Sequence, residues 1–400
     1  MLGAALAAPG ALSPARAGDF DASLDVRLVA SNAERSFLEG GLGPLRYGEN
    51  QSGVQLGRLR LALTAPFWDI VTLHLDASSW GHPQKNPIDL TEGYLQLRPY
   101  PRAGVRARLK AGAFYAPVSL ANRAPGWESP YTLSYSALDS WVAEELRTIG
   151  LEGQLEWLGT RLGHSIDLAL VAGVFGWNEP AGVALATHGF AISDRQSTLF
   201  GEVGEPGGGP VHGFELFREI DGRVGNYFGA ELKYLDRITV RGLHYDNHAD
   251  PSAYDPVIKE HAWSTRFDTL GARAEGQAGW TAIAQWMQGV TRVAPAGVGE
   301  LEWYFATKYL LLSQRWGAHV LSVRYDDFYV SPQAPVAAGA QQGHAATLAY
   351  AYSPGPHWRL MLEGVRVRSS QSNRELFLGE APLATDSALQ LSVRYTLDPG

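Results

Sequence analysis

The sequence of 400 residues contains no cysteine, which excludes disulfide bonds, thiolate metal sites and cysteine nucleophiles together. Charged residues make up only 18% of the chain, whereas a typical soluble domain carries about 25%. The net charge of −8 argues against nucleic-acid binding, which requires clustered basic charge. No stretch approaches the ~20 apolar residues of a membrane-spanning helix. If the chain crosses a membrane, it must therefore do so as a closed β-barrel, because backbone groups in lipid need partners.

Signatures of common enzymes are missing as well. The sequence has no G-x-S-x-G, no H-E-x-x-H and no P-loop, so it offers no nucleophile elbow, zinc helix or phosphate cradle. The 11 histidines are scattered singly, and their spacing predicts no metal site. We therefore expect a protein that is not an enzyme and that needs no metal and no cofactor.

Apolar and polar residues alternate with a period of two along most of the chain. Residues 24–28, 59–63, 166–170 and 389–395 are clear examples, each with one apolar row and one polar row. This pattern is typical of strands with one face on lipid and the other on enclosed water. The predicted strands are 20–30, 54–64, 70–78, 89–98, 105–116, 147–157, 165–176, 227–235, 238–247, 262–275, 280–291, 301–312, 318–328, 343–352, 358–369 and 387–397.

The connections between these strands alternate between short and long. Residues 65–69 and 276–279 are short, whereas 117–146 and 177–226 are long. Short periplasmic turns and long outer loops are typical of outer-membrane barrels. The sequence therefore predicts an all-β fold, a single transmembrane antiparallel barrel of 16 strands from residue 18 to 400, in the bacterial outer membrane. The long loop 177–226 leaves room for one more hairpin near residues 214–217, which would give 18 strands.

Two local features add detail to this prediction. Residues 1–17 are small and apolar and end in an A-x-A cleavage pattern, so we expect a signal peptide. Its usual basic start is missing, which indicates that the first methionine is internal to a longer signal. Near Gly364 the apolar residues change from one parity to the other, which predicts a β-bulge at that glycine.

The alternation also predicts which charges face the interior. A charge on the lipid face costs roughly 2–4 kcal/mol at the midplane, so the polar row must point inward. The predicted pore-lining bases are Arg58, Arg60, Arg106, Arg108 and Lys110, and the acids on the next strand are Glu152 and Glu156. Rings of Arg and Lys favour anions. Opposite charges on neighbouring strands also pair and cancel each other's field, so a purely structural role for the basic row stays open.

Residues 110–120 (KAGAFYAPVSL) and 147–153 (RTIGLEG) resemble the phosphate-selective porin O and P family and related Gram-negative porins. Residues 192–197 (ISDRQS) are similar to a polar outer-loop segment of such porins. The resemblance covers about half of the chain. Two departures are Tyr115, where the family often has a basic residue, and a chain end at residues 397–400 that is not aromatic.

The resemblance implies a barrel of 16 strands, a homotrimer and a lumenal basic row of Arg106, Arg108 and Lys110. It also implies that the third outer loop, residues 117–146, folds inward and constricts the channel, and the alternative is a loop that lies over the mouth of the barrel. The residues that we expect to form this constriction are Arg123, Trp127, Glu128, Tyr131 and Asp139.

We therefore predict a passive diffusion channel for small solutes that prefers anions such as phosphate and contacts outer-membrane lipid and lipopolysaccharide. Two alternatives remain. One is a channel for carbohydrates or organic acids, in which aromatic residues form a path for sugars. These aromatic residues are Tyr94, Phe114, Trp127, Tyr131 and Tyr304. The other is a non-conducting barrel whose long loop 177–226 binds a partner at the cell surface.

Overall fold

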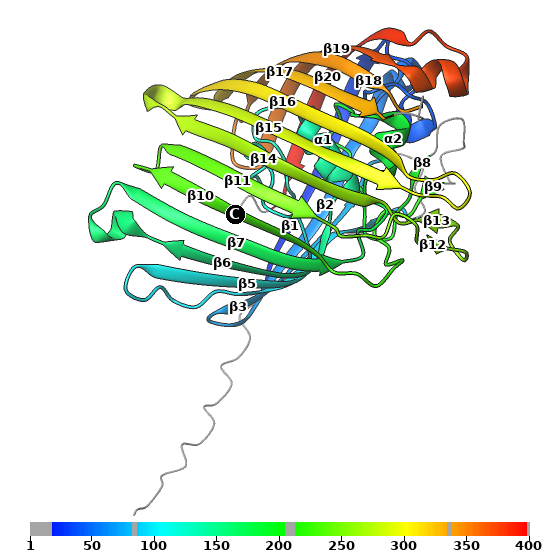
Figure 1. The fold of residues 1–400 in the computed structure, drawn as a ribbon. Coiled ribbons are helices and arrows are strands. Elements are labelled where there is room, and N and C mark those ends of the chain that lie inside the picture. Colours follow the sequence, from blue (N-terminus) through cyan, green and yellow to red (C-terminus); the bar gives the residue numbers. More distant parts are fainter. Residues whose placement is uncertain (1–17, 82–85, 205–212, 334–337, 398–400) are drawn as a thin grey trace, which may run out of the picture.

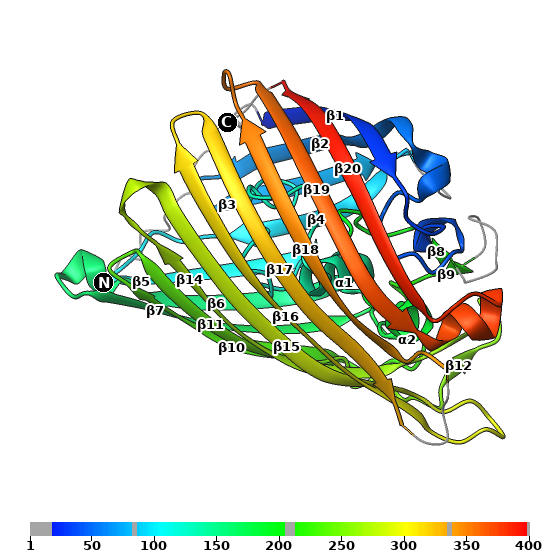
Figure 2. The same cartoon turned by 90° about the horizontal axis from the view of Figure 1, so that it is seen from above.

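The chain forms a closed barrel of sixteen antiparallel strands (Figures 1 and 2). Each strand is hydrogen-bonded to the barrel strands before and after it in the sequence, and the first strand, β1, pairs with the last, β20, to close the barrel. The computed structural model describes residues 18–81, 86–204, 213–333 and 338–397. The expected signal peptide, residues 1–17, lies outside this described part. The prediction of an all-β barrel of 16 strands is confirmed.

Each of the sixteen predicted strands corresponds to one barrel strand, although several extend further than expected toward the outer loops. The strands are β1 (Asp19–Ser31), β2 (Gly53–Trp68), β3 (Val71–Ser79), β4 (Asp89–Leu97), β5 (Val105–Phe114), β6 (Thr148–Trp157), β7 (Ile166–Gly176), β10 (Gly225–Tyr234), β11 (Ile238–Asp246), β14 (Ser264–Glu275), β15 (Trp280–Val293), β16 (Leu301–Trp316), β17 (His319–Pro332), β18 (Gln341–Tyr352), β19 (Trp358–Gln371) and β20 (Leu383–Thr396).

The connections contain short helices and two small hairpins. The helices are η1 (Phe37–Glu39), η2 (Glu49–Gln51), α1 (Ala137–Glu145), η3 (Gly159–Leu162), α2 (Val183–His188), η4 (Gln277–Gly279) and η5 (Arg374–Leu378). The small hairpins are β8 (Val203–Gly204) with β9 (Gly213–Phe214), and β12 (Tyr254–Asp255) with β13 (Glu260–His261). The alternative with 18 strands is wrong, because β8 and β9 pair only with each other and stay in the outer loop.

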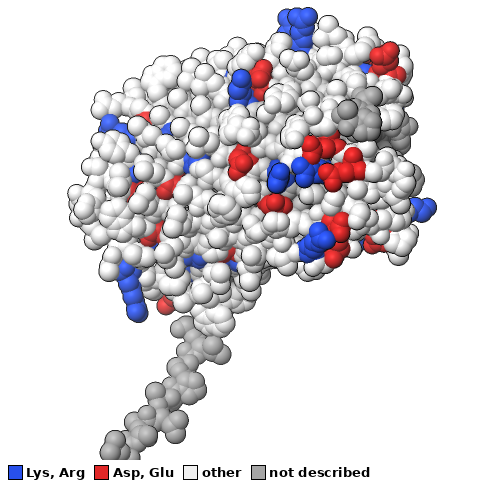
Figure 3. Space-filling view, in the orientation of Figure 1, with Lys and Arg blue, Asp and Glu red and all other residues white. Residues whose placement is uncertain are grey.

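The outer wall carries the apolar row of each strand. On β7, for example, Leu168, Leu170 and Val174 are exposed, while Phe175 points inward and is buried. Figure 3 shows that much of this wall is uncharged and that many charged side chains gather toward the loop end. Trp280 and Trp316 lie exposed near the short turns, where indole rings favour the headgroup level. No helix in the described part of the chain has the length and apolar character needed to cross a membrane.

The two sides of the wall differ in their outer halves. On β1–β7 the outward side chains stay apolar almost to the loops. Toward β14–β19 the wall is longer, and exposed charged side chains appear on its outer half, among them Lys308, Asp327 and Arg366. The barrel therefore has one short apolar side and one tall side with a charged upper edge.

The predicted bulge at Gly364 is wrong. The register of β19 with β18 and with β20 runs through Gly364 without a shift. Val365 and Val367 face the interior and are buried there, and Arg366 faces outward. A real irregularity lies between β1 and β2, where the register shifts between Asp25 and Val26.

Candidate functional site

The connection between β5 and β6, residues 115–147, folds into the barrel rather than over its mouth. All nine residues of its helix α1 are buried. The ring centroid of Trp141 lies 5.4 Å from that of Phe267 and 4.9 Å from that of Phe305. Phe267 and Phe305 project inward from β14 and β16, and Figure 1 shows α1 behind these strands. The inner face of the outer half of the barrel is therefore an apolar packing surface for this loop.

Polar side chains of the wall hold the backbone of the same loop. The carboxylate of Glu363 accepts hydrogen bonds from Leu133 N at 2.6 Å and Ser134 N at 2.9 Å. Arg324 donates to Ser134 O at 2.6 Å and to Tyr135 O at 2.8 Å. Because buried backbone groups need partners, these bonds allow a loop without regular structure to lie inside the barrel.

The two ends of the loop meet at the residues that carry the family resemblance. The guanidinium of Arg147 lies over the ring of Tyr115 at 3.5 Å and donates to Ser197 O at 2.8 Å. A basic residue in place of Tyr115 would bring a second positive charge to Arg147. An aromatic ring attracts the cation instead, so this departure from the family pattern fits its surroundings.

A second inward segment, residues 181–198, packs on the first one. Gln196 donates to Gly126 O at 2.8 Å, and Asp194 pairs with Arg27 at 2.5 Å and with Arg46 at 2.9 Å. Burial alone would raise the pKa of Asp194, but the two guanidinium groups outweigh it and hold the pKa well below its usual value. The outer half of the barrel interior is thus filled by two loops and a buried network of ions.

This packing changes the environment of two predicted pore-lining bases. Arg58 and Arg60 face inward as expected, but only 3% and 4% of their surface is exposed. Arg58 pairs with Glu128 at 3.1 Å, and Arg60 pairs with Asp76 at 2.6 Å. The expectation that these two bases border open water therefore does not hold, because the loops cover them.

The three bases of β5 lie deeper, toward the periplasmic turns, and stay partly exposed. Arg106 and Arg108 pair with Glu156, and Lys110 lies 3.6 Å from Glu152, as the register of β5 with β6 requires. The side chains of these bases keep 16–27% of their surface exposed. They face the wet half of the interior, and their charge is largely balanced by the two glutamates.

The periplasmic half also contains arginines without a carboxylate partner. Among the residues that the structure describes, Arg123, Arg315 and Arg359 form no ion pair. Arg123 keeps much of its surface exposed, and desolvation by the protein atoms around it, together with the charges of Arg241 and Arg273, lowers its pKa. Arg359 donates to Pro130 O at 2.6 Å, which leaves its charge unbalanced. Arg241 and Arg273, in contrast, pair with Glu231 and Glu275.

The other predicted constriction residues are placed as follows. Trp127 stacks on Tyr115 with ring centroids 4.2 Å apart. Burial would raise the pKa of Glu128, but Arg394 and Arg58 outweigh it and lower that pKa. Tyr131 lies 5.7 Å below the guanidinium of Arg273. These residues lie inside the barrel, with Trp127 and Glu128 in the packed region and Arg123 at its periplasmic face.

Asp139 is the predicted constriction residue with the most unusual environment. It is fully buried in the first turn of α1, and its backbone N–H donates to Ser136 Oγ at 3.0 Å. Burial raises its pKa to about 6, against the hydrogen bonds from Ser119 and Ser136 that lower it. Asp139 therefore does not line water but sits at the base of the packed helix.

The proposed aromatic path for sugars is broken in this structure. Tyr94 faces the interior half-buried, but Phe114 is completely covered. Tyr304 lies on the outer face of β16 with 45% of its surface exposed, so it cannot contribute to a path inside the barrel. It was assigned inward wrongly because β16 carries aromatic residues on both faces.

Sequence reasoning missed most of the buried ion network. Asp25 and Arg27 on β1, like Arg324 and Asp326 on β17, are pairs of opposite charge two residues apart. Residues at that spacing share one face of a strand, so alternation already placed both pairs inward. Nothing in the local sequence indicates that they hold loops, since their loop partners are up to about 190 residues away.

The geometry defines a class of structure, a 16-stranded barrel whose third outer loop lies inside it. A scan of protein-family models and a search of curated proteins returned no match.

Solved structures of similar fold include an OmpT loop-deletion mutant of Vibrio cholerae (TM-score 0.55, 9% identity, 95% of this chain and 99% of that chain). They also include the outer-membrane channel DcaP of Acinetobacter baumannii (TM-score 0.56, 10% identity, covering 95% and 97%). A third is an anion-selective porin of Comamonas acidovorans (TM-score 0.51, 10% identity, covering 95% and 99%). This likeness shows that the chain has the general porin fold. The narrower resemblance to phosphate-selective porins stays a prediction.

Proposed function

We propose that this protein is a passive diffusion channel of the bacterial outer membrane that prefers small anions, and that it performs no catalysis. The observation that carries the preference is the set of arginines without ion pairs, Arg123, Arg315 and Arg359, in the periplasmic half of the interior. Unbalanced fixed charge in a narrow, partly wet space attracts counter-ions and repels ions of its own sign.

Two inward carboxylates that lack an ion pair within the described part of the chain, Glu363 and Glu92, do not cancel this charge. Glu363 is fully buried and accepts backbone N–H groups of the inward loop. Glu92 accepts the N–H of Tyr115 at 3.1 Å. Both lie against the packed loop rather than in the partly exposed region. Asp19 and Asp167, at the periplasmic end, also form no ion pair among the described residues, and Asp167 accepts hydrogen bonds from Thr160. In this proposal the three arginines outweigh these two carboxylates, beside the balanced row of β5 and β6.

Residues 115–147 are the element that narrows the channel in this proposal. The packed helix α1 and the segment 181–198 leave the outer half little free volume, and a solute path must pass beside them. The neighbour described as an anion-selective porin supports this proposal without deciding it, since its sequence identity is 10%. Phosphate is one candidate solute, and organic acids and sugars are tested by the same experiment.

The test is current through purified, folded protein in planar bilayers under a KCl gradient. We expect a reversal potential close to the equilibrium potential of chloride. The triple variant Arg123→Gln, Arg315→Gln, Arg359→Gln should shift the reversal potential toward the equilibrium potential of potassium. Arg366→Gln is the matched control, because Arg366 lies on the outer face and should leave the potential unchanged. Current blocked by sugar but not by phosphate would favour the carbohydrate alternative, and absence of current would contradict a channel.

The short apolar side of the wall supports a homotrimer with β2–β5 at the contact between copies. Small outward residues such as Ala107, Ala111 and Gly93 make this side smooth. We expect Ala111→Arg to convert the trimer to monomers on semi-native gels. Ala284→Arg, which places the same charge on the outer face of β15, should leave the trimer intact. Equal loss of trimer in both variants would contradict this contact.

The tall side of the wall then faces lipid and lipopolysaccharide. Arg366 and Arg368 are exposed on the outer half of β19, and Lys308 is exposed on β16. Cations at this level would lie near the phosphate groups of lipopolysaccharide, with which Arg and Lys form strong charge-assisted hydrogen bonds.

A further inference from the structure

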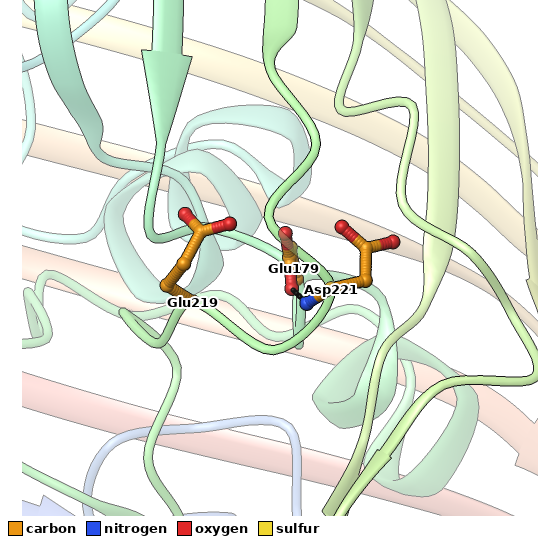
Figure 4. Close-up of side chains that lie close together, drawn as sticks. All are labelled: Glu179, Glu219 and Asp221. Atoms are coloured by element: carbon orange, nitrogen blue, oxygen red, sulfur yellow. Dashed lines mark hydrogen bonds between the residues drawn. The ribbon is translucent and has the colours of Figure 1, made fainter.

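Three carboxylates converge at the base of the long outer loop, away from the interior described above. Glu179 follows β7, and Glu219 and Asp221 precede β10, so the group joins the two ends of the loop (Figure 4). One carboxylate oxygen from each residue lies within 4.8 Å of the other two. Residues about 40 positions apart thus present their oxygens to one shared point.

Glu179 is buried with an oxygen that has no partner. Only 2% of Glu179 is exposed, and its Oε2 accepts hydrogen bonds from Asp221 N at 2.8 Å and from Ile220 N. Its Oε1 is buried and accepts no hydrogen bond, and Oε1 of Glu219 is in the same condition. Figure 4 shows the unbonded oxygen of Glu179 between the carboxylates of Glu219 and Asp221. Burial, together with the carboxylates of Asp221 and Glu219, raises the pKa of Glu179 to about 9, so this buried oxygen takes up either a proton or a cation.

Side chains of this chain supply little of the positive charge that would balance the three carboxylates. Within the described residues, one cation comes within ion-pair distance, because Arg223 Nε lies 3.8 Å from Asp221 Oδ2. The same guanidinium pairs more closely with Asp250 at 2.8 Å, and its side chain is 53% exposed. Arg218, the other nearby base, pairs with Glu215. Glu179 and Glu219 therefore have no cationic partner among these side chains.

The donor set indicates which cation fits. Two oxygens bound to one Ca²⁺ at about 2.4 Å lie at most about 4.8 Å apart, as these oxygens do. Ligands that are all carboxylates suit a hard cation, whereas zinc and copper favour nitrogen and sulfur. Mg²⁺ keeps several of its waters and is usually held by one or two carboxylates, so a site of three protein carboxylates favours calcium. We propose that Glu179, Glu219 and Asp221 bind a calcium ion that ties together the two ends of the loop 177–224.

Such an ion would fix the loop where it enters and leaves the barrel. Trp177 N donates to Glu219 Oε2 at 2.9 Å, and Asp250 N donates to Asp221 Oδ2, so the cluster also reaches the next outer loop. The residues between its ends include the segment 181–198 that fills the barrel interior. Calcium would therefore hold this segment in place from outside, independently of whether the channel conducts.

Terbium is a suitable probe because it takes calcium sites and emits when a nearby tryptophan transfers energy to it. Trp177 is next to the cluster, so full-length protein folded in detergent without lipopolysaccharide should show Tb³⁺ emission on excitation of tryptophan. Calcium should compete with it, with a dissociation constant at or below about 1 mM, the range of extracellular calcium modules. Trp177→Phe should lower the emission while calcium binding measured by calorimetry is kept.

The variants Glu179→Gln and Asp221→Asn should each weaken calcium binding at least about tenfold, since each removes one charged ligand. Glu179→Gln keeps an oxygen for the two backbone N–H groups, and heat-modifiable gel migration verifies that the barrel has folded. Asp255→Asn is the control, because Asp255 is in an outer loop but bonds only its own turn. Absence of calcium binding by the folded wild-type protein, or equal binding by the variants and the control, would overturn the proposal.

Discussion

The two halves of the barrel interior are built on different principles. In the outer half, inward residues such as Phe305 and Phe328 pack on loops, and Arg27 and Asp194 form an ion pair with almost no exposure. In the periplasmic half, inward residues such as Lys233 and Arg108 remain partly exposed, and some arginines lack a partner. Where loops fill the barrel, the inward row thus contains apolar residues as well as polar ones, and its polar residues are buried in ion pairs and hydrogen bonds.

The largest difference between the halves should appear when an ion pair is broken in the outer half. Asp194→Ala removes the carboxylate that Arg27 and Arg46 share and leaves Arg27 with Asp25 as its remaining carboxylate, and breaking a buried pair in this way costs about 3–5 kcal/mol. We expect this loss in the free energy of unfolding, measured by urea titration in detergent, and a larger and noisier single-channel conductance as the loop loosens. Asp194→Asn, which keeps an acceptor, should lose less.

A variant Asp194→Ala with wild-type stability and conductance would show that the loop is held by its apolar contacts alone. The ion network would then contribute nothing measurable to the outer half, and the packing of α1 would be what holds the loop.

The pH dependence of the outer half should be governed in part by Asp139. Its pKa is about 6 when folded and near 3.8 when unfolded, so the folded protein binds the extra proton between these values. The contribution of Asp139 to stability should therefore be fully present below pH 4 and be lost, by about 2–3 kcal/mol, as the pH rises from 4 through 6. The lowered pKa values of Asp194 and Glu128 act in the opposite direction. Asp139→Asn, compared with the wild type by urea unfolding from pH 4 to 7, should flatten this part of the profile. A profile unchanged by the substitution would place the titration elsewhere.

The smallest effect is expected for an ion pair of the periplasmic half. Lys233 lies 3.3 Å from Glu231, and 38% of its side chain is exposed. Partly exposed pairs contribute about 0–1 kcal/mol, so Lys233→Gln should change the free energy of unfolding by less than about 1 kcal/mol. A loss as large as that of Asp194→Ala would erase the contrast between the halves. The same urea titration in detergent measures both variants.

The strands and their faces could be predicted from the sequence because alternation is a local signal. Leu168 and Leu170 point to lipid, and Arg106 pairs with Glu156, as their positions required. The prediction of which residues face lipid failed where a loop distant in the sequence surrounds the side chain. Val365 was expected to need a bulge in order to reach lipid, but it packs inside because the loops make the outer half of the interior apolar.

The candidate sites divide in the same way. The inward direction of Arg58 followed from its strand, but its burial did not, because Glu128 approaches it from a loop 70 residues away. The cluster of carboxylates that contains Glu179 and Glu219 was missed for the same reason, since 40 residues separate these two members in the sequence. Sequence patterns report which way a side chain points, and long-range folding of the loops decides what it meets.

The absence of native cysteine allows the contrast between the halves to be measured directly by labelling single cysteines with thiol reagents from the periplasmic side. Cysteines at Thr72 and Gln96, in the periplasmic half, should react quickly, and those at Thr265 and Ser369, in the packed half, should stay unmodified in the folded protein. At Gln96, which pairs with Lys110, a negatively charged reagent should react faster than a positively charged one. Equal rates at all four positions, or a preference for the positive reagent, would contradict the account.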